Sequence, residues 1–183
     1  ARSGSRGIKN KNIKKLVGRP LIAYSIKIAL KIRAIKKVIF SSDSKKYIFI
    51  AQKNGCKDFH LRSKKISGNS SSELEVFQDF VFKNLKLNKK LPKYFIHFRP
   101  TTPVRYLKTI NKVIKYFKAN KNKCSSMRST TLMSNPAYRY SRIINNKLCA
   151  ITKIDFDLDK YFKPRHFFQN TYICNCLIDI YKT

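Results

Sequence analysis

The chain has 183 residues, enough for one domain with a sizeable core, and its 43 % hydrophobic content is too high for a disordered protein. No apolar run reaches the roughly 20 residues of a membrane span, and the polar start does not resemble a secretory signal, so we expect no membrane association. Lys and Arg number 41 against 9 Asp and Glu, a formal net charge of +32. Such a high positive charge attracts polyanions, but the basic residues are spread along the whole chain without a nucleic-acid-binding motif. Nucleic-acid binding is therefore kept as an alternative function.

The cysteines are odd in number and irregular in spacing, which argues against both a disulfide framework and a zinc site. They are Cys56, Cys124, Cys149, Cys174 and Cys176. We interpret them as free thiols of a protein in the reducing cytoplasm.

A polar loop with two glycines, residues 2–12, opens the chain. Apolar residues then recur at helical spacing, which predicts a helix over 21–32. A short strand is expected at 38–40. Ser44 can cap a following helix that ends near Asn54, where Gly55 offers the left-handed conformation.

A second strand is expected at 59–61, followed by a polar loop over 62–71. Ser70 and Glu73 have the spacing of a capping box, which predicts a helix to about Leu85. The next elements in chain order are a strand at 94–98, a helix at 106–118 and a possible strand at 124–129. A hairpin over 138–151 turns at Asn145-Asn146, and a strand at 171–181 closes the chain.

Strand and helix alternate at least three times, which predicts an α/β fold: a three-layer αβα sandwich with a mostly parallel sheet, plus a small β-hairpin insertion. The loops after the strands at 38, 59 and 94 would share the carboxyl edge of the sheet, where ligands bind. We expect one domain over residues 1–183. Because such a sheet normally opens with a strand and this chain opens in the loop, we also expect a first strand to be missing.

Seven blocks of the sequence carry motifs in a telling order, among them the opening A-R-S-G-S-R-G-I-K-N-K-N and the later R-P-T-T-P-V-R. The first resembles the signature loop of the acylneuraminate cytidylyltransferase family, and the second resembles its (Q/R)-P-T-(S/T)-P-L-R block. The blocks lie at residues 1–12, 18–21, 38–44, 61–72, 99–105, 135–138 and 164–179. The resemblance implies a nucleotide-diphospho-sugar transferase fold. It also implies that the 2-hydroxyl of an acidic nonulosonic sugar attacks the α-phosphate of CTP, forming the CMP-sugar and releasing pyrophosphate.

The resemblance also implies roles for individual residues. Arg2 and Lys11 would contact the phosphates as catalytic cations. The nucleotide would be held by Gly4, Ser5, Arg6, Asn12, Arg62, Ser70, Ser71 and Ser72. Arg99, Arg165 and Asn175 would bind the sugar, since a guanidinium matches a carboxylate. Other residues are expected to be structural: Arg105 as a scaffold residue, Asp43 as a loop cap, His97 as a satisfied core residue, and His60 as an isolated one.

Four departures from the family pattern leave alternatives open. Arg6 replaces a lysine, Asn69 an aspartate and Glu73 a serine, and Cys176 replaces a glycine that can need a positive φ. The family's Mg²⁺ ligands lie past the last residue, so we expect the metal to be bound beyond it. A homodimer is expected from the resemblance. The alternatives are a sugar nucleotidyltransferase of the ketodeoxy-octonate type and a degenerate, non-catalytic relative.

Overall fold

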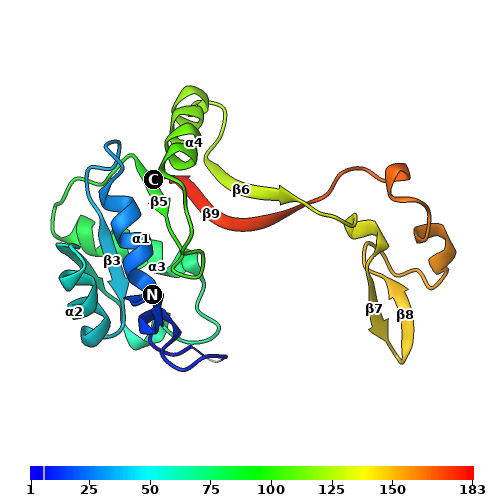
Figure 1. The fold of residues 1–183 in the computed structure, drawn as a ribbon, viewed down its shortest axis with the longest axis horizontal. Coiled ribbons are helices and arrows are strands. Elements are labelled where there is room, and N and C mark those ends of the chain that lie inside the picture. The colour runs from blue at the N-terminus through cyan, green and yellow to red at the C-terminus, as the bar shows by residue number, and fades with distance from the viewer. Residues whose placement is uncertain (6) are drawn as a thin grey trace. The chain divides into compact units, whose positions relative to one another are not determined.

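The computed structural model describes residues 1–5 and 7–183, and the chain divides into two compact units. The first unit is Ala1–Arg128 with Cys176–Thr183, and the second is Ser129–Asn175. Strands β6 (Ser126–Leu132) and β9 (Tyr172–Lys182) belong to both units (Figure 1). The expectation of a single domain over 1–183 therefore stays a prediction.

The helices and strands of the first unit follow the predicted order closely. The helices are α1 (Leu21–Leu30), α2 (Lys45–Lys53), α3 (Glu73–Lys86) and α4 (Leu107–Asn120). The strands are β1 (Lys15–Leu16), β2 (Arg19–Pro20), β3 (Ile39–Ser42), β4 (Asp58–Leu61) and β5 (Tyr94–His97). Short 3-10 turns at Lys11–Ile13 and Lys64–Ile66 complete it.

Helical spacing of apolar residues explains why α1 and α4 form where they do. In α4, Ile110, Ile114 and Phe117 fall on one face and are all buried. Helix α2 begins as predicted, with the Ser44 hydroxyl accepting from the Tyr47 amide at 3.3 Å. Gly55 follows it at a φ of +94°, a conformation that side chains rarely adopt.

The start of α3 differs from the prediction. The capping box consists of Ser72 and Glu75, not Ser70 and Glu73. The Ser72 hydroxyl accepts from the Glu75 amide at 3.2 Å, and the Glu75 carboxylate accepts from the Ser72 amide at 2.6 Å. Both registers have the sequence pattern, but this one leaves Glu73 free to pair with Arg99.

The predicted α/β class is confirmed, with more mixed strand pairing than expected. Strands β3 and β4 pair in parallel, with Ser41 opposite His60. Strand β5 pairs with β9 antiparallel, with His97 opposite Asp179, and β6 lies on the other side of β9. The predicted mostly parallel sheet is therefore correct for β3–β4 but not for β5–β9, because the last strand returns against β5.

Alternation along these strands separates two helix-covered faces, as in a three-layer arrangement. One face packs into the two apolar clusters that contain α1, α2 and α4; its strand residues are Phe40, Phe59, Tyr94, Ile96, Ile178 and Ile180. The opposite face meets α3 through Phe77, Asp79 and Phe80; its strand residues are His60, Phe95, His97 and Tyr181. The polar network described below lies on this α3 face.

The second unit contains the predicted hairpin. Strands β7 (Ser141–Ile144) and β8 (Lys147–Ala150) pair antiparallel around Asn145 and Asn146, whose φ angles are 49° and 59°. Two successive positive φ values are typical of the tight turn that asparagine favours. Further 3-10 turns lie at Ala137–Arg139, Leu158–Tyr161 and Arg165–Phe167. Among the described residues of the whole chain, no helix is both long and apolar enough to cross a membrane.

Candidate nucleotide site

The glycine loop at the start of the chain is fastened to the end of β3 by Asp43. The Ser3 amide donates to Asp43 Oδ1 at 2.8 Å, and the Ser3 hydroxyl donates to Oδ2 at 2.6 Å. Burial alone would raise the pKa of Asp43, but the hydrogen bonds that its carboxylate accepts, mainly from Ser3, and the charge of Arg62 together lower it. Asp43 is therefore an ionised loop brace, as the sequence predicts.

Two predicted ligands in this loop are tied to their surroundings. Asn12 is buried and donates to the Arg2 carbonyl at 2.9 Å, while the Arg2 guanidinium donates to the Gly68 carbonyl. The structure thus brings the glycine loop against the serine-rich loop before α3. Lys11 and Ser5 are half-buried and Gly4 is exposed, whereas Arg6 lies outside the described residues.

Arg62 follows β4 and lies over β3. Its Nε donates to the Ser41 hydroxyl at 2.8 Å, and its Nη2 donates to the Ser41 carbonyl at 3.2 Å. Burial lowers the pKa of Arg62, whereas the carboxylates of Asp43 and Glu73 act in the opposite direction. Arg62 therefore stands within electrostatic reach of both the loop brace and the Arg99 cluster.

His60 is not the isolated residue that the sequence predicts. Its Nδ1 lies 2.8 Å from the Ser41 hydroxyl, and its Nε2 lies 2.7 Å from Asp79 Oδ2 on α3. Lys83 Nζ donates to the same Asp79 oxygen at 2.8 Å. Burial lowers the pKa of His60, although Asp79 acts in the opposite direction. The imidazole is therefore neutral near pH 7.

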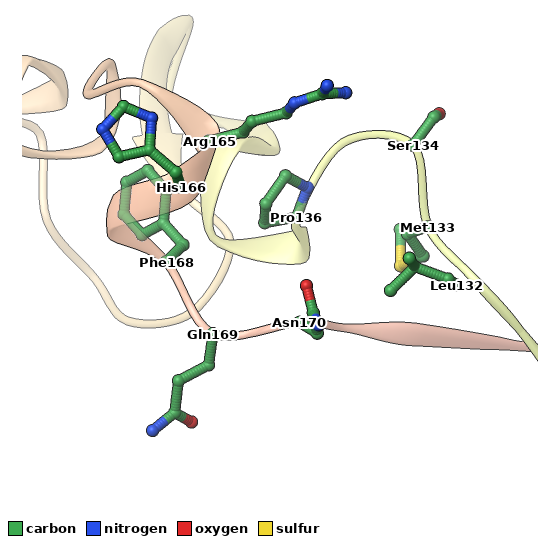
Figure 2. A pocket seen from close by; sticks show the side chains of 9 residues that line it. All are labelled: Leu132, Met133, Ser134, Pro136, Arg165, His166, Phe168, Gln169 and Asn170. Atoms are coloured by element: carbon green, nitrogen blue, oxygen red, sulfur yellow. The ribbon is translucent and has the colours of Figure 1, made fainter.

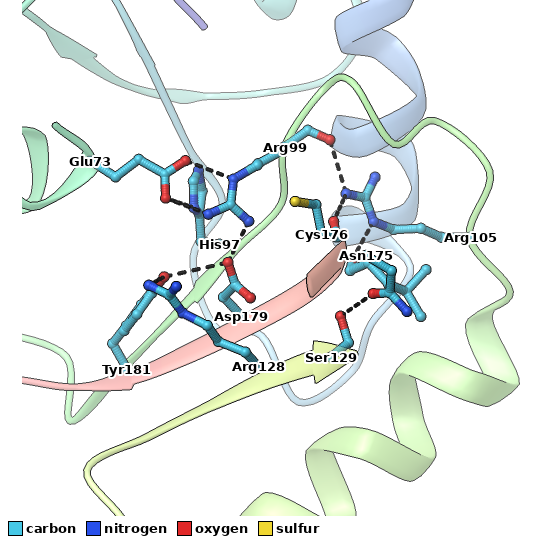
Figure 3. A network of polar contacts seen from close by, with 11 residues as sticks. Glu73, His97, Arg99, Arg105, Arg128, Ser129, Asn175, Cys176, Asp179 and Tyr181 are labelled. Atoms are coloured by element: carbon cyan, nitrogen blue, oxygen red, sulfur yellow. Dashed lines mark hydrogen bonds and ion pairs between the residues drawn. The ribbon is translucent and has the colours of Figure 1, made fainter. Parts of the chain in front are cut away.

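Arg99 is held by two protein carboxylates on the α3 face of the sheet (Figure 3). Its Nε donates to Glu73 Oε1 at 2.7 Å and its Nη2 to Oε2, while its Nη1 donates to the buried Asp179. His97 and Arg99 together lower the pKa of Glu73 to about 2 against the effect of burial. The guanidinium of Arg99, which the sequence predicts to bind the sugar carboxylate, is therefore occupied by the carboxylate of Glu73.

Glu73, His97 and Asp179 form a cluster of three potential metal ligands within the described part of the chain. The Arg99 guanidinium bridges both carboxylates, and a cation there would have to displace it. His97 Nδ1 is buried 3.5 Å from Glu73 and makes no hydrogen bond to any described group. The prediction of His97 as a satisfied core residue is therefore wrong.

Arg105 is structural, as expected. Its guanidinium donates to the carbonyls of Arg99 and Cys176 (Figure 3). It also donates to the carbonyls of Thr102 and Leu177 and to the Ser25 hydroxyl. Burial lowers its pKa to about 10. The Cys176 backbone has a φ of 58°, the strained conformation foreseen where the family pattern has glycine.

The second unit contains a pocket of about 720 Å³, shown in Figure 2. Its lining includes Arg165, one of the predicted sugar ligands, together with Ser134 and Asn170. Asn175, the other predicted ligand in this unit, is not in the lining. Its side chain accepts from Ser129 at 2.6 Å and donates to Thr131 at 2.8 Å.

The three predicted serines differ in their surroundings. Ser72 caps α3, Ser71 donates to the Lys65 carbonyl at 3.3 Å, and Ser70 is exposed. Sequence reasoning missed Ser41 and Asp79 altogether. Ser41 could be paired with His60 only by knowing the register of β3 against β4, for which the sequence gives no signal.

Comparison with known proteins shows which family the chain is similar to. The family described as Cytidylyltransferase matches residues 1–170. The chain is 32 % identical over 164 residues to an N-acylneuraminate cytidylyltransferase of Escherichia coli O18:K1:H7, which covers 88 % of this chain but only 36 % of that protein. It is 36 % identical over 84 residues to a CMP-N,N'-diacetyllegionaminic acid synthase of Campylobacter jejuni, covering 46 % of this chain and 36 % of that protein.

The fold is similar to that of CMP:2-keto-3-deoxy-manno-octonic acid synthetase, solved in complex with CTP. The TM-score is 0.67 over all of this chain and 71 % of that structure, at 14 % identity, so the likeness concerns the fold alone. The family match spans nearly the whole chain and includes the glycine loop and the Arg62 and Arg99 segments. The chain therefore belongs to the cytidylyltransferase family that this match identifies.

Proposed function

We propose that the protein transfers CMP from CTP to the 2-hydroxyl of an acidic nonulosonic sugar and releases pyrophosphate, for surface glycan synthesis. The observation that carries this proposal is the glycine loop fastened by Ser3 to Asp43 beside the Arg62 guanidinium. A loop held open by such a brace can direct backbone amides and cations toward a triphosphate. The chain spans 36 % of the Escherichia coli relative, 15 % of a bifunctional Helicobacter pylori relative and 52 % of a Campylobacter coli relative.

On the nucleotide side, Arg2 and Lys11 would neutralise the phosphates, and Gly4, Ser5 and Arg6 would contribute the loop itself. Asn12 supports this loop by donating to the Arg2 carbonyl. Arg62 and the serines from Ser70 to Ser72 would line the cytidine side. Nucleotidyl transfer depends mainly on positioning and charge neutralisation, which such groups provide.

On the sugar side, Arg99, Arg165 and Asn175 remain the proposed ligands. Arg99 would have to exchange Glu73 for the carboxylate of the sugar, since both need the same bidentate edge of the guanidinium. An acidic substrate therefore competes with a carboxylate of the protein. This competition is peculiar to a chain with glutamate at position 73.

Mg²⁺ would add charge neutralisation for the leaving pyrophosphate. Within residues 1–5 and 7–183, the cluster Glu73, His97 and Asp179 does not fit this ion, because Arg99 already bridges its carboxylates and Mg²⁺ prefers oxygen ligands. The proposal takes no step through the metal. Its ligands would have to come from elsewhere.

We also propose that the protein acts in the cytoplasm as a homodimer. The five thiols are all free, which suits a reducing compartment. The second unit exposes large apolar side chains that a partner copy would cover, among them Ile143, Ile154, Phe156 and Phe162. Light scattering that gives the mass of two chains would support the dimer, and a monomer at all concentrations would contradict it.

A second candidate function is polyanion binding, favoured by one helix face. Lys108, Lys112, Lys115 and Lys118 are exposed on α4, which has no acidic residue. Binding of mixed-sequence RNA that weakens steeply with salt and ignores CTP would favour this function. Binding that CTP displaces would assign the same cations to the nucleotide site instead.

The test of the first proposal is pyrophosphate release with Mg²⁺, each of the four nucleoside triphosphates and a panel of acidic sugars. We expect release only with CTP and one nonulosonic acid. Release with ketodeoxy-octonate instead would move the protein to that related type. No release by a folded protein with any pair would favour a non-catalytic relative.

A further inference from the structure

We infer that His60, held by Asp79, is a positioning residue that sets the Arg62 guanidinium through the Ser41 hydroxyl. The inference deepens the proposed function and rests on it, because Arg62 is the residue proposed to face the nucleotide. It concerns groups that the nucleotide itself would not touch.

Donor and acceptor roles fix the direction of this hydrogen-bond relay. Arg62 Nε can only donate, so the Ser41 oxygen accepts from it at 2.8 Å. The single proton of the Ser41 hydroxyl then goes to His60 Nδ1 at 2.8 Å, which makes Nδ1 an acceptor. The neutral imidazole therefore carries its proton on Nε2 and donates it to Asp79 at 2.7 Å.

The surroundings of the imidazole favour this single arrangement. His60 is only 5 % exposed, and the ring of Phe80 packs edge-on against it at 5.5 Å between centroids. Lys83 holds Asp79 at 2.8 Å and also donates to the Leu61 carbonyl at 3.1 Å, which joins α3 to β4. A second proton on His60 would make Nδ1 a donor and would bring a positive charge toward Arg62.

The relay holds one edge of the Arg62 guanidinium on the protein. Nε and Nη2 are used by Ser41, whereas Nη1 makes no hydrogen bond to any group that the structure describes. Asp43, Glu73 and Arg2 are the charged groups that act on this guanidinium. Fixing two nitrogens on the protein leaves the third available to a ligand, and the already ordered side chain would lose little further entropy on binding.

The relay is tested with His60→Phe, which keeps an aromatic ring but loses both hydrogen bonds, and with His60→Asn, whose amide oxygen can replace the acceptor Nδ1. Asp79→Ala is a second, less buried disruption should His60→Phe fail to fold. Lys86→Met, on the exposed last turn of α3, is the matched control. Two readouts are taken on the full chain: the ¹⁵N-detected Arg62 Nε–H signal without nucleotide, and the Kd for CTP.

We expect a slowly exchanging Arg62 Nε–H signal in the wild type and in Lys86→Met. The signal should be lost in His60→Phe and Asp79→Ala, and it should return in His60→Asn. The CTP affinity should fall about 3- to 10-fold in His60→Phe and in Asp79→Ala, which corresponds to the free energy of one hydrogen bond. An Arg62 signal that does not respond to His60 would overturn the inference, as would a loosened Arg62 with unchanged Kd. A wild type that binds no CTP contradicts the proposed function instead, and the Arg62 signal tells the two failures apart.

Discussion

At the scale of single residues, the pairing of Glu73 with His97 and Arg99 makes the stability of the fold depend on pH. The folded-state pKa of Glu73 is about 2, below its ordinary value of 4.5, so its ionised form stabilises the fold above pH 4.5. That contribution is lost as the pH falls from 4.5 toward 2. Because Glu73 is nearly half exposed, we expect the contribution to be only about 1 kcal/mol.

Urea unfolding of the wild type and Glu73→Gln between pH 7 and pH 2.5 measures this contribution. The free energies of unfolding should differ by about 1 kcal/mol at neutral pH and converge in acid. Two curves that stay parallel over the whole range would show that the ionised Glu73, paired with His97 and Arg99, adds no pH-dependent stability. The same variant should bind an acidic sugar more tightly, since the competing carboxylate is gone.

The second prediction at this scale concerns the backbone strain at Cys176. Its φ of 58° is costly for a residue with a side chain, so Cys176→Gly should raise the free energy of unfolding by about 0.5–1 kcal/mol. Cys174, two residues earlier in β9, is not among the residues with positive φ, and Cys174→Gly should destabilise instead. Thermal unfolding of the two variants side by side checks the argument. A loss of stability in both would mean that no strain is stored at position 176.

At the scale of elements, the start of α3 offers a direct comparison of two serines. Ser72→Ala should cost about 1 kcal/mol, because it removes the acceptor for the Glu75 amide. Ser70→Ala should change stability by less than about 0.5 kcal/mol, since Ser70 is exposed and precedes the cap. Urea unfolding measures both, and equal losses would contradict the capping register found here.

The sequence predicts elements better than it predicts their partners. Helical periodicity identifies α1 and α4, and Ser44 with Gly55 marks both ends of α2, because these signals are local. Ser70 and Ser72 both fit the capping pattern, whereas the Glu73 side chain pairs with Arg99, which lies 26 residues further along the chain. The pairing of Ser41 with His60 and the return of β9 against β5 are likewise decided by strand register.

At the scale of the whole molecule, the candidate site is assembled from segments far apart in the chain. The family pattern predicts that the loop at 1–12, Arg62 and the serine loop are functional, and the structure brings Arg2 against Gly68 and Ser3 against Asp43. It does not predict that Arg99 would be occupied by Glu73, because the family pattern has a serine at this position. The charge of +32 adds a general attraction for anions that salt will screen.

The central claim is that the braced loop binds CTP, and calorimetric titration of the full chain with CTP, UTP, ATP and GTP at two salt concentrations tests it. We predict that CTP binds at least about tenfold more tightly than the others. Asp43→Ala should weaken CTP about tenfold by releasing Ser3, and Asp58→Ala, which removes an exposed ion pair with Lys37, should not. Equal binding of all four nucleotides with a steep salt dependence, or no binding by the folded wild type, would contradict the account.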